Sequence, residues 1–145
     1  MIVPGILLDT HVLYWLVSGA EPLSNDALVA IGENQDAGTL FVSPITAWEL
    51  AIAARKPAHK APPDLGANTP ARWFSAAIEA TAAKIIPIKQ RIAIEAAAVV
   101  TVTGHKDPGD CYLIATARVR KIPIMTRDHV MRGLAVPQYL QIVDC

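Results

Sequence analysis

Residues 5–18 read GILLDTHVLYWLVS, and their pattern indicates the class of fold. The apolar run at 5–8 predicts a short buried strand that ends at Asp9. Apolar residues then recur over 10–18 with the three- and four-residue spacing of a helix. A buried strand followed directly by a helix is the building unit of a parallel α/β sheet. An acidic residue stands at the junction of the two elements.

The same alternation continues along the rest of the chain. Further strands are predicted at 40–42, 85–88, 122–126 and 140–143. Further helices are predicted over 25–34, 44–55, 71–83, 89–102 and 110–121, and a short one begins at Asp128. Residues 56–70 contain four prolines and predict a loop rather than a domain boundary. We therefore predict an α/β fold with a mostly parallel central sheet flanked by helices, in a single domain over residues 1–145.

Composition narrows the classes of function. The 145 residues suit one domain, and the charged share of 18% excludes a largely disordered chain. Thirteen basic and thirteen acidic residues give no net charge, which argues against a general electrostatic affinity for nucleic acid or anionic membranes. The sequence shows no membrane-spanning run, no signal-peptide pattern and no zinc or disulfide spacing of its two cysteines. These features predict a reduced, cytoplasmic protein without membrane association.

Acidic residues mark the candidate site. Asp9 and Asp128 each follow a predicted strand, and the carboxyl ends of parallel strands share one edge, where ligand sites form. Glu49 and Asp110 lie three or four residues from apolar positions of their helices, so both are expected to face inward. The apolar stripe predicted for the helix of Glu49 consists of Ile45, Trp48 and Ile52.

An unpaired carboxylate on an inward face is costly, and a cation shared among several carboxylates would remove that cost. Oxygen ligands without clustered His or Cys favour Mg²⁺ or Mn²⁺ over zinc. Asp9, Asp107 and Asp128 also precede helices and can serve as N-caps. For Asp107 we prefer the cap, whereas for Asp9 and Asp128 both interpretations stay open. The alternative for Glu49, which lies in mid-helix, is an Arg or Lys partner inside the fold.

The histidines, tryptophans and basic residues do not indicate a specific reaction. No histidine has metalloprotease spacing, and His11, His59, His105 and His129 are all interpreted as structural or surface residues. The three tryptophans occupy apolar helix positions, which indicates core packing or a partner interface. Nucleotide-binding glycine loops and hydrolase elbows are missing from the sequence. Six basic residues cluster between positions 106 and 132. They either line the rim of the acidic site or form a solvent-exposed helix face: Lys106, Arg118, Arg120, Lys121, Arg127 and Arg132.

Four segments, in order along the chain, resemble the motifs of PIN-domain toxins of the VapC type. They are LDTHVLYW at 8–15, SPITAWEL at 43–50, DPGDCYLIATA at 107–117 and TRD at 126–128. The resemblance implies a PIN fold and a metal-dependent endoribonuclease, the toxin of a type II toxin–antitoxin pair. It further implies an RNA substrate, a cognate antitoxin and a homodimer.

Residue by residue, the resemblance assigns a catalytic quartet of Asp9, Glu49, Asp110 and Asp128. Within it, Asp9, Asp110 and Asp128 are the implied ligands of Mg²⁺, with Mn²⁺ as the other candidate. Thr126 matches a hydroxyl residue beside the site.

Two positions depart from the family pattern. Family members often carry a bulky residue where this chain has Gly109, and an Arg where it has Cys111. Neither departure removes an acid of the quartet.

Two other functions are weighed. A non-catalytic PIN-like module would bind RNA or a protein and keep the acids for folding. A phosphoaspartate protein using Asp9 ranks last, because the haloacid-dehalogenase pattern needs a second Asp where this chain has His11.

Overall fold

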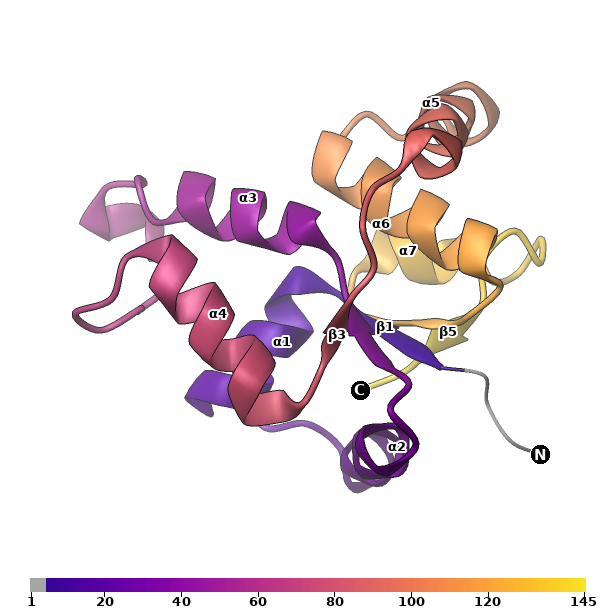
Figure 1. The fold of residues 1–145 in the computed structure, drawn as a ribbon. Coiled ribbons are helices and arrows are strands. Elements are labelled where there is room, and N and C mark those ends of the chain that lie inside the picture. The colour runs from indigo at the N-terminus through magenta and orange to yellow at the C-terminus, as the bar shows by residue number, and fades with distance from the viewer. Residues whose placement is uncertain (1–4) are drawn as a thin grey trace.

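The computed structural model describes residues 5–145 (Figure 1), so the first four residues of the predicted domain lie outside the described part. The strands are β1 (Ile6–Leu8), β2 (Leu40–Val42), β3 (Lys84–Ile85), β4 (Ile124–Met125) and β5 (Ile142–Val143). The helices are α1 (Thr10–Ser18), α2 (Asn25–Ala37), α3 (Pro44–Ala53), α4 (Pro70–Thr81), α5 (Gln90–Thr103), α6 (Pro108–Arg120) and α7 (His129–Gly133). A short 3₁₀ turn, η1 (Ala58–Lys60), interrupts the proline-rich loop.

The strands form one sheet in the order β3-β2-β1-β4-β5, and every pairing between neighbours is parallel. β1 lies in the centre, where Leu7 pairs with Phe41 of β2 and Leu8 pairs with Met125 of β4. The predicted α/β fold with a mostly parallel central sheet is confirmed. The chain first builds the sheet outward on the β2 side of β1 and then on the β4 side. The point where this direction changes, between β1 and β4, is where open α/β sheets bind ligands.

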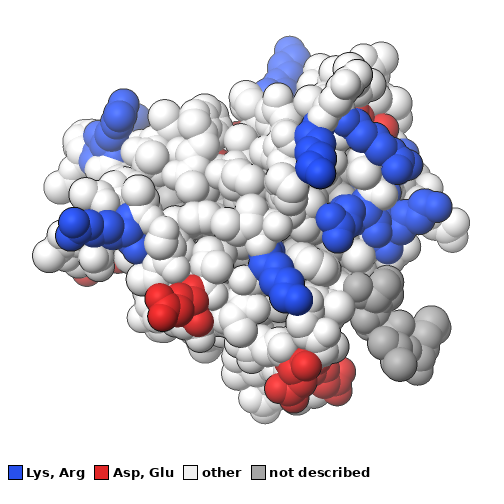
Figure 2. All heavy atoms as spheres, in the orientation of Figure 1, with Lys and Arg blue, Asp and Glu red and all other residues white. Residues whose placement is uncertain are grey.

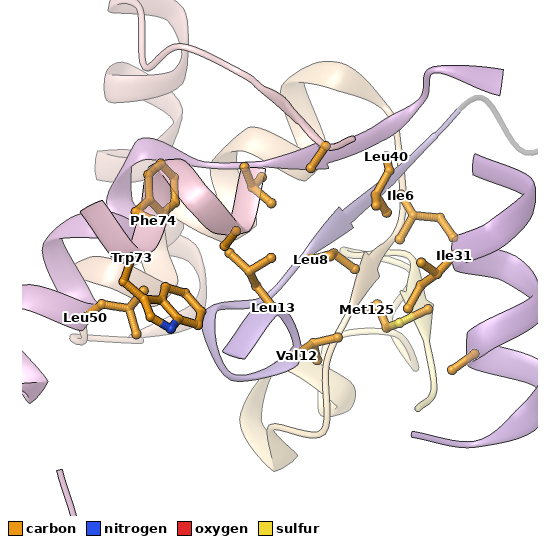
Figure 3. Packing of buried hydrophobic residues seen from close by; sticks show 14 of the residues in the cluster. Ile6, Leu8, Val12, Leu13, Ile31, Leu40, Leu50, Trp73, Phe74 and Met125 are labelled. Atoms are coloured by element: carbon orange, nitrogen blue, oxygen red, sulfur yellow. The ribbon is translucent and has the colours of Figure 1, made fainter. Parts of the chain in front are cut away.

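Hydrophobic residues cover both faces of the sheet. The side chain of Leu8 joins a core formed with α1, α2 and α4, in which Leu13 and Trp73 are buried (Figure 3). Leu7 points the opposite way and joins a second core with Ile114 of α6 and with α5. Figure 1 shows α1, α2 and α4 on one side of the sheet and α5 and α6 on the other. Burial on both faces explains why these strands are apolar throughout rather than alternating.

Four helices that border the candidate site begin with a side-chain cap. Asp9 accepts a hydrogen bond from the Thr10 backbone at the start of α1, and Ser43 caps α3. Asp107 caps α6 and Asp128 caps α7. The capping interpretation of Asp107 is confirmed, and Asp9 and Asp128 are also caps. Each cap places an oxygen-bearing side chain just beyond a strand or loop, at the entrance of a helix.

The orientation predicted for α3 is wrong. Trp48 and Ile52, expected to face inward, keep 48% and 46% of their surface exposed. The buried positions of this helix are Thr46 and Leu50. α3 is apolar on most sides, so its periodicity did not indicate which face would be covered by α1, α4 and α6. Glu49 therefore lies at the margin of the buried face and is half-buried.

The strands are shorter than the apolar runs that predicted them. The prediction of 122–126 became Ile124–Met125, and that of 85–88 became Lys84–Ile85. Within residues 5–145, no helix combines the length and the apolar composition needed to cross a membrane.

Candidate metal centre

The acidic residues converge at the carboxyl edge of the sheet. Asp9 directly follows the central strand β1, and Thr126 and Asp128 follow its neighbour β4. Glu49 approaches from α3, and Asp110 from the first turn of α6. Residues far apart in the sequence thus meet beside the β1–β4 switch point, as expected for this type of sheet.

Three carboxylates form the tightest group. Glu49, Asp107 and Asp110 each offer an oxygen, and these oxygens all lie within 4.8 Å of one another. Asp107 is exposed, whereas Glu49 and Asp110 are half-buried. Among residues 5–145, no Lys or Arg lies within ion-pair distance of Glu49, so the alternative of a cationic side-chain partner is not supported. The donor set therefore fits a hard divalent cation such as Mg²⁺ or Mn²⁺.

Hydrogen bonds connect the other acids to this group. The Thr126 hydroxyl donates to Asp9 Oδ2 at 2.7 Å and accepts from the Asp128 backbone N–H at 3.0 Å. The Thr10 hydroxyl donates to Glu49 Oε1 at 2.5 Å, while its backbone N–H donates to Asp9 Oδ1 at 2.7 Å. Two threonines thus hold three of the acids in one network.

Asp128 lies at the far end of this network. Its Oδ2 accepts from the Met131 backbone N–H at 2.9 Å, and it is outside the group of three close carboxylates. Its negative charge still raises the pKa of both Asp9 and Asp110. Asp128 therefore belongs to the same acidic cluster electrostatically.

Burial raises the pKa of the central carboxyls. For Glu49 the pKa rises from 4.5 to about 7, mainly through loss of solvation and then through repulsion from Asp9, Asp110 and Asp107. For Asp110 it rises from 3.8 to about 6, again mainly through burial, and a hydrogen bond from His105 opposes the rise. The pKa of Asp9 is also raised by burial, against the hydrogen bond from Thr126. A bound cation would relieve the repulsion and favour the ionised forms.

The sequence did not predict how His105 and Gly109 contact the site. His105, interpreted as a structural or surface residue, places Nε2 at 2.8 Å from Asp110 Oδ2. Gly109 leaves room for the Glu49 carboxylate, because a Cβ at position 109 would lie 2.5 Å from Glu49 Oε2. Asp107, for which the cap was the preferred interpretation, also lies close to Glu49 and Asp110.

A cleft of about 500 Å³ opens beside the acidic group. Its walls combine aromatic and aliphatic side chains with two of the acids, Glu49 and Asp107. The other lining residues are Thr10, His11, Tyr14, Trp15, Trp48, Leu50, Ile52, Ala53, Lys56, Ala61, Pro62, Pro63 and Pro108. The exposed Trp48 is therefore part of a cleft wall rather than of the core.

Three of the six basic residues between positions 106 and 132 make ion pairs or hydrogen bonds away from the acidic group. Arg118 pairs with Glu95 at 2.8 Å, and Arg132 pairs with Asp144 at 3.1 Å. Arg127 donates to the backbone carbonyl of Cys145 at 2.8 Å. The remaining three are exposed: Lys106, Arg120 and Lys121.

Comparison with known proteins gives the family. Residues 6–137 match the family model described as the PIN domain. The chain belongs to the PIN-domain family. A search of curated proteins found no match.

Solved structures of toxin–antitoxin proteins share the fold over nearly the whole chain. One is a toxin–antitoxin complex from Klebsiella pneumoniae, 26% identical, with a TM-score of 0.60 and coverage of 96% of each chain. A DNA-bound VapBC from Salmonella typhimurium is 16% identical, with a TM-score of 0.64 and coverage of 97% of each chain. VapBC-5 from Mycobacterium tuberculosis is 16% identical, with a TM-score of 0.61 and coverage of 98% of this chain and 99% of that chain. The resemblance to VapC-type PIN proteins is confirmed.

Proposed function

We propose that this PIN domain is a divalent-metal-dependent endoribonuclease, the toxin of a type II toxin–antitoxin pair. It forms a single domain over residues 1–145 and hydrolyses phosphodiester bonds of RNA in the cytoplasm. The observation that carries the proposal is the convergence of Asp9, Glu49, Asp107 and Asp110 at the carboxyl edge of the sheet. In the described part of the chain, no Lys or Arg pairs with this acidic group.

Asp9, Glu49, Asp110 and Asp128 are the proposed catalytic residues, and Asp9, Asp110 and Asp128 the proposed metal ligands. Asp107 and Glu49 join them as further candidate ligands, because the carboxylate oxygens of Glu49, Asp107 and Asp110 lie within 4.8 Å of one another. Mg²⁺ or Mn²⁺, when bound, supplies a Lewis acid that activates water and stabilises negative charge on the scissile phosphate.

The chain's own groups prepare this chemistry. Thr126 donates to Asp9 and so favours its ionised form despite burial. Thr10 orients Glu49 through the hydrogen bond to Oε1. In its ionised form the half-buried Glu49 carboxylate is suited to accept a proton from the attacking water. No side chain is required as a covalent nucleophile.

A group of cationic side chains that could contact RNA lies at a distance from the acidic group. On the face shown in Figure 2, Lys and Arg gather over α5 and the end of α6. Asp110 of the acidic group lies in the first turn of α6, and the helix ends at the exposed Arg120. Ten residues of helix span about 15 Å, so a nucleic-acid strand can reach both ends. Contacts of this kind would position the phosphate backbone without reading sequence.

The cleft beside the site suits a protein partner. It is lined by exposed apolar side chains of α3 and by the acids Glu49 and Asp107. An antitoxin helix with apolar anchors and one basic side chain would complement these walls. The solved relatives described as toxin–antitoxin complexes support this partner. We also propose that the toxin is a homodimer.

The test is cleavage of total cellular RNA by purified protein with Mg²⁺, with Mn²⁺ or with chelator. Asp9→Asn serves as the inactive variant, and Asp36→Asn, which neutralises an exposed acid in α2, as the matched control. We expect discrete metal-dependent fragments from wild type and Asp36→Asn, and a loss of at least ~100-fold in Asp9→Asn. Cleavage by Asp9→Asn at the wild-type rate would refute the mechanism. Metal binding without cleavage of any RNA would favour the non-catalytic module.

A further inference from the structure

His105 is fixed in the loop between α5 and α6. Its backbone N–H donates to the Thr103 hydroxyl at 3.1 Å, and its carbonyl accepts from Cys111 Sγ at 3.4 Å. Only 12% of its side chain is exposed. The backbone on both sides of the ring is therefore tied to neighbouring helices, and the imidazole has little freedom to turn away.

The ring is directed at a carboxylate of the acidic group. Nε2 of His105 lies 2.8 Å from Oδ2 of Asp110, whose side chain is 22% exposed. With Asp110 ionised, His105 is the donor of this hydrogen bond. An aspartate carboxylate otherwise rotates broadly about its last torsion. The bond to His105 removes that freedom.

The orientation matters because Asp110 has other neighbours. Glu49 and Asp107 bring oxygens to within 4.8 Å of Asp110, on a side chain that still has lone pairs free after one hydrogen bond. The backbone N–H of Asp110 also donates to Asp107 Oδ1 at 3.0 Å, which fixes the relation of these two residues. A cation shared by the group would need the Asp110 carboxylate in one defined orientation.

We propose that His105 is a positioning residue, whose Nε2–H holds the Asp110 carboxylate in the orientation that binds a divalent cation. This inference rests on the proposed function. Carboxylates that ligate metals are commonly held by such outer hydrogen bonds, and loss of the outer partner typically lowers metal affinity about 10–100-fold. The imidazole acts through Asp110 and does not itself contact the metal.

The experiment measures Mn²⁺ affinity by electron paramagnetic resonance, with no RNA present. His105→Leu removes the donor, whereas His105→Gln places an amide N–H near the position of Nε2. The matched control is His59→Leu, at an exposed histidine of η1. We expect affinity to fall about 10-fold or more in His105→Leu, to be largely restored in His105→Gln, and to stay unchanged in His59→Leu. Circular dichroism and Tm verify folding, and His105→Asn, too short to reach Asp110, replaces His105→Leu if that variant unfolds.

A second readout separates positioning from direct ligation. Electron spin echo modulation of Mn²⁺ bound to the wild type should show no directly coordinated nitrogen. A directly bound nitrogen, or equal Mn²⁺ affinity in wild type and His105→Leu, would overturn the proposal. Failure of the wild type to bind Mn²⁺ would overturn both this proposal and the nuclease mechanism. If the protein binds Mn²⁺ with the expected His105 dependence but cuts no RNA, the nuclease fails and the positioning role stands.

Discussion

The missing side chain of Gly109 determines how closely Glu49 approaches the first turn of α6. A Cβ at this position would lie 2.5 Å from Glu49 Oε2 and 2.6 Å from its Cδ, which is inside van der Waals contact. Gly109→Ala should therefore displace the Glu49 carboxylate away from Asp107 and Asp110. We expect weaker Mn²⁺ binding, measured by titration, because one donor of the close group moves away.

Gly32→Ala is the matched control for this substitution. Gly32 lies in α2, and a Cβ there meets no atom within 4 Å. Replacing a helical glycine with alanine should raise stability by up to ~1 kcal/mol and leave Mn²⁺ affinity unchanged. Equal Mn²⁺ affinities in the two variants would contradict the prediction that the close approach of Glu49 to α6 supports metal binding.

Single residues differ in how far the sequence predicted them. Asp9 was predicted because a buried strand ends there, and ends of parallel strands meet at one edge. His105 was not predicted, because its contact with Asp110 depends on a loop that turns back over five residues. The sequence offers one indication of this contact. His105 comes two residues before Asp107-Pro108, which are the N-cap and the first residue of α6 and so determine where its first turn begins.

At the scale of elements, the order of strands and helices could be predicted and their ends could not. Apolar runs mark where a segment is buried, and Ile122 and Ile86 are buried outside the strands beside them. Only the hydrogen-bond ladder determines where a strand stops, and that depends on neighbours distant in sequence. The exposed face of α3 was likewise unpredictable from its own sequence, since several of its faces are apolar.

α3 provides a prediction about the partner. Trp48 is 48% exposed on a wall of the cleft, so it is not part of the buried core. Trp48→Ala should weaken binding of the co-expressed antitoxin by at least ~10-fold while Tm changes little, because aromatic anchors dominate such interfaces. Co-purification and titration of the antitoxin measure the effect. Val29→Ala, at an exposed residue of α2 outside the cleft, is the control, and equal weakening by both variants would contradict the proposed surface.

The whole molecule is neutral, yet it contains a local cluster of acids. Glu49, Asp107 and Asp110 gather at the carboxyl edge of the sheet, whereas Lys and Arg gather over α5 and the end of α6 on the face in Figure 2. Net charge therefore could not reveal the site; only the fold brings Asp9, Glu49 and Asp110 together. This concentration of acids should make the stability of the entire domain depend on pH and on metal.

The metal-free protein should lose stability as pH rises from 5 to 8. The pKa of Glu49 is raised from 4.5 to about 7, and that of Asp110 from 3.8 to about 6, so the folded state holds more protons than the unfolded state across this range. Stability falls with pH wherever the folded state binds the extra protons. Tm in the presence of chelator, measured at each pH, should decrease through this window in wild type and less steeply in Glu49→Gln.

Divalent metal should reverse this trend at the alkaline end. Ionised carboxylates bind the cation, so added Mg²⁺ or Mn²⁺ should raise Tm more at pH 8 than at pH 5. Glu79→Gln, which neutralises an exposed acid of α4, should follow the wild type in both conditions. An identical pH profile in wild type and Glu49→Gln would mean that Glu49 is ionised in the metal-free fold. The fold would then accommodate the repulsion between the ionised carboxylates of the site without a bound cation.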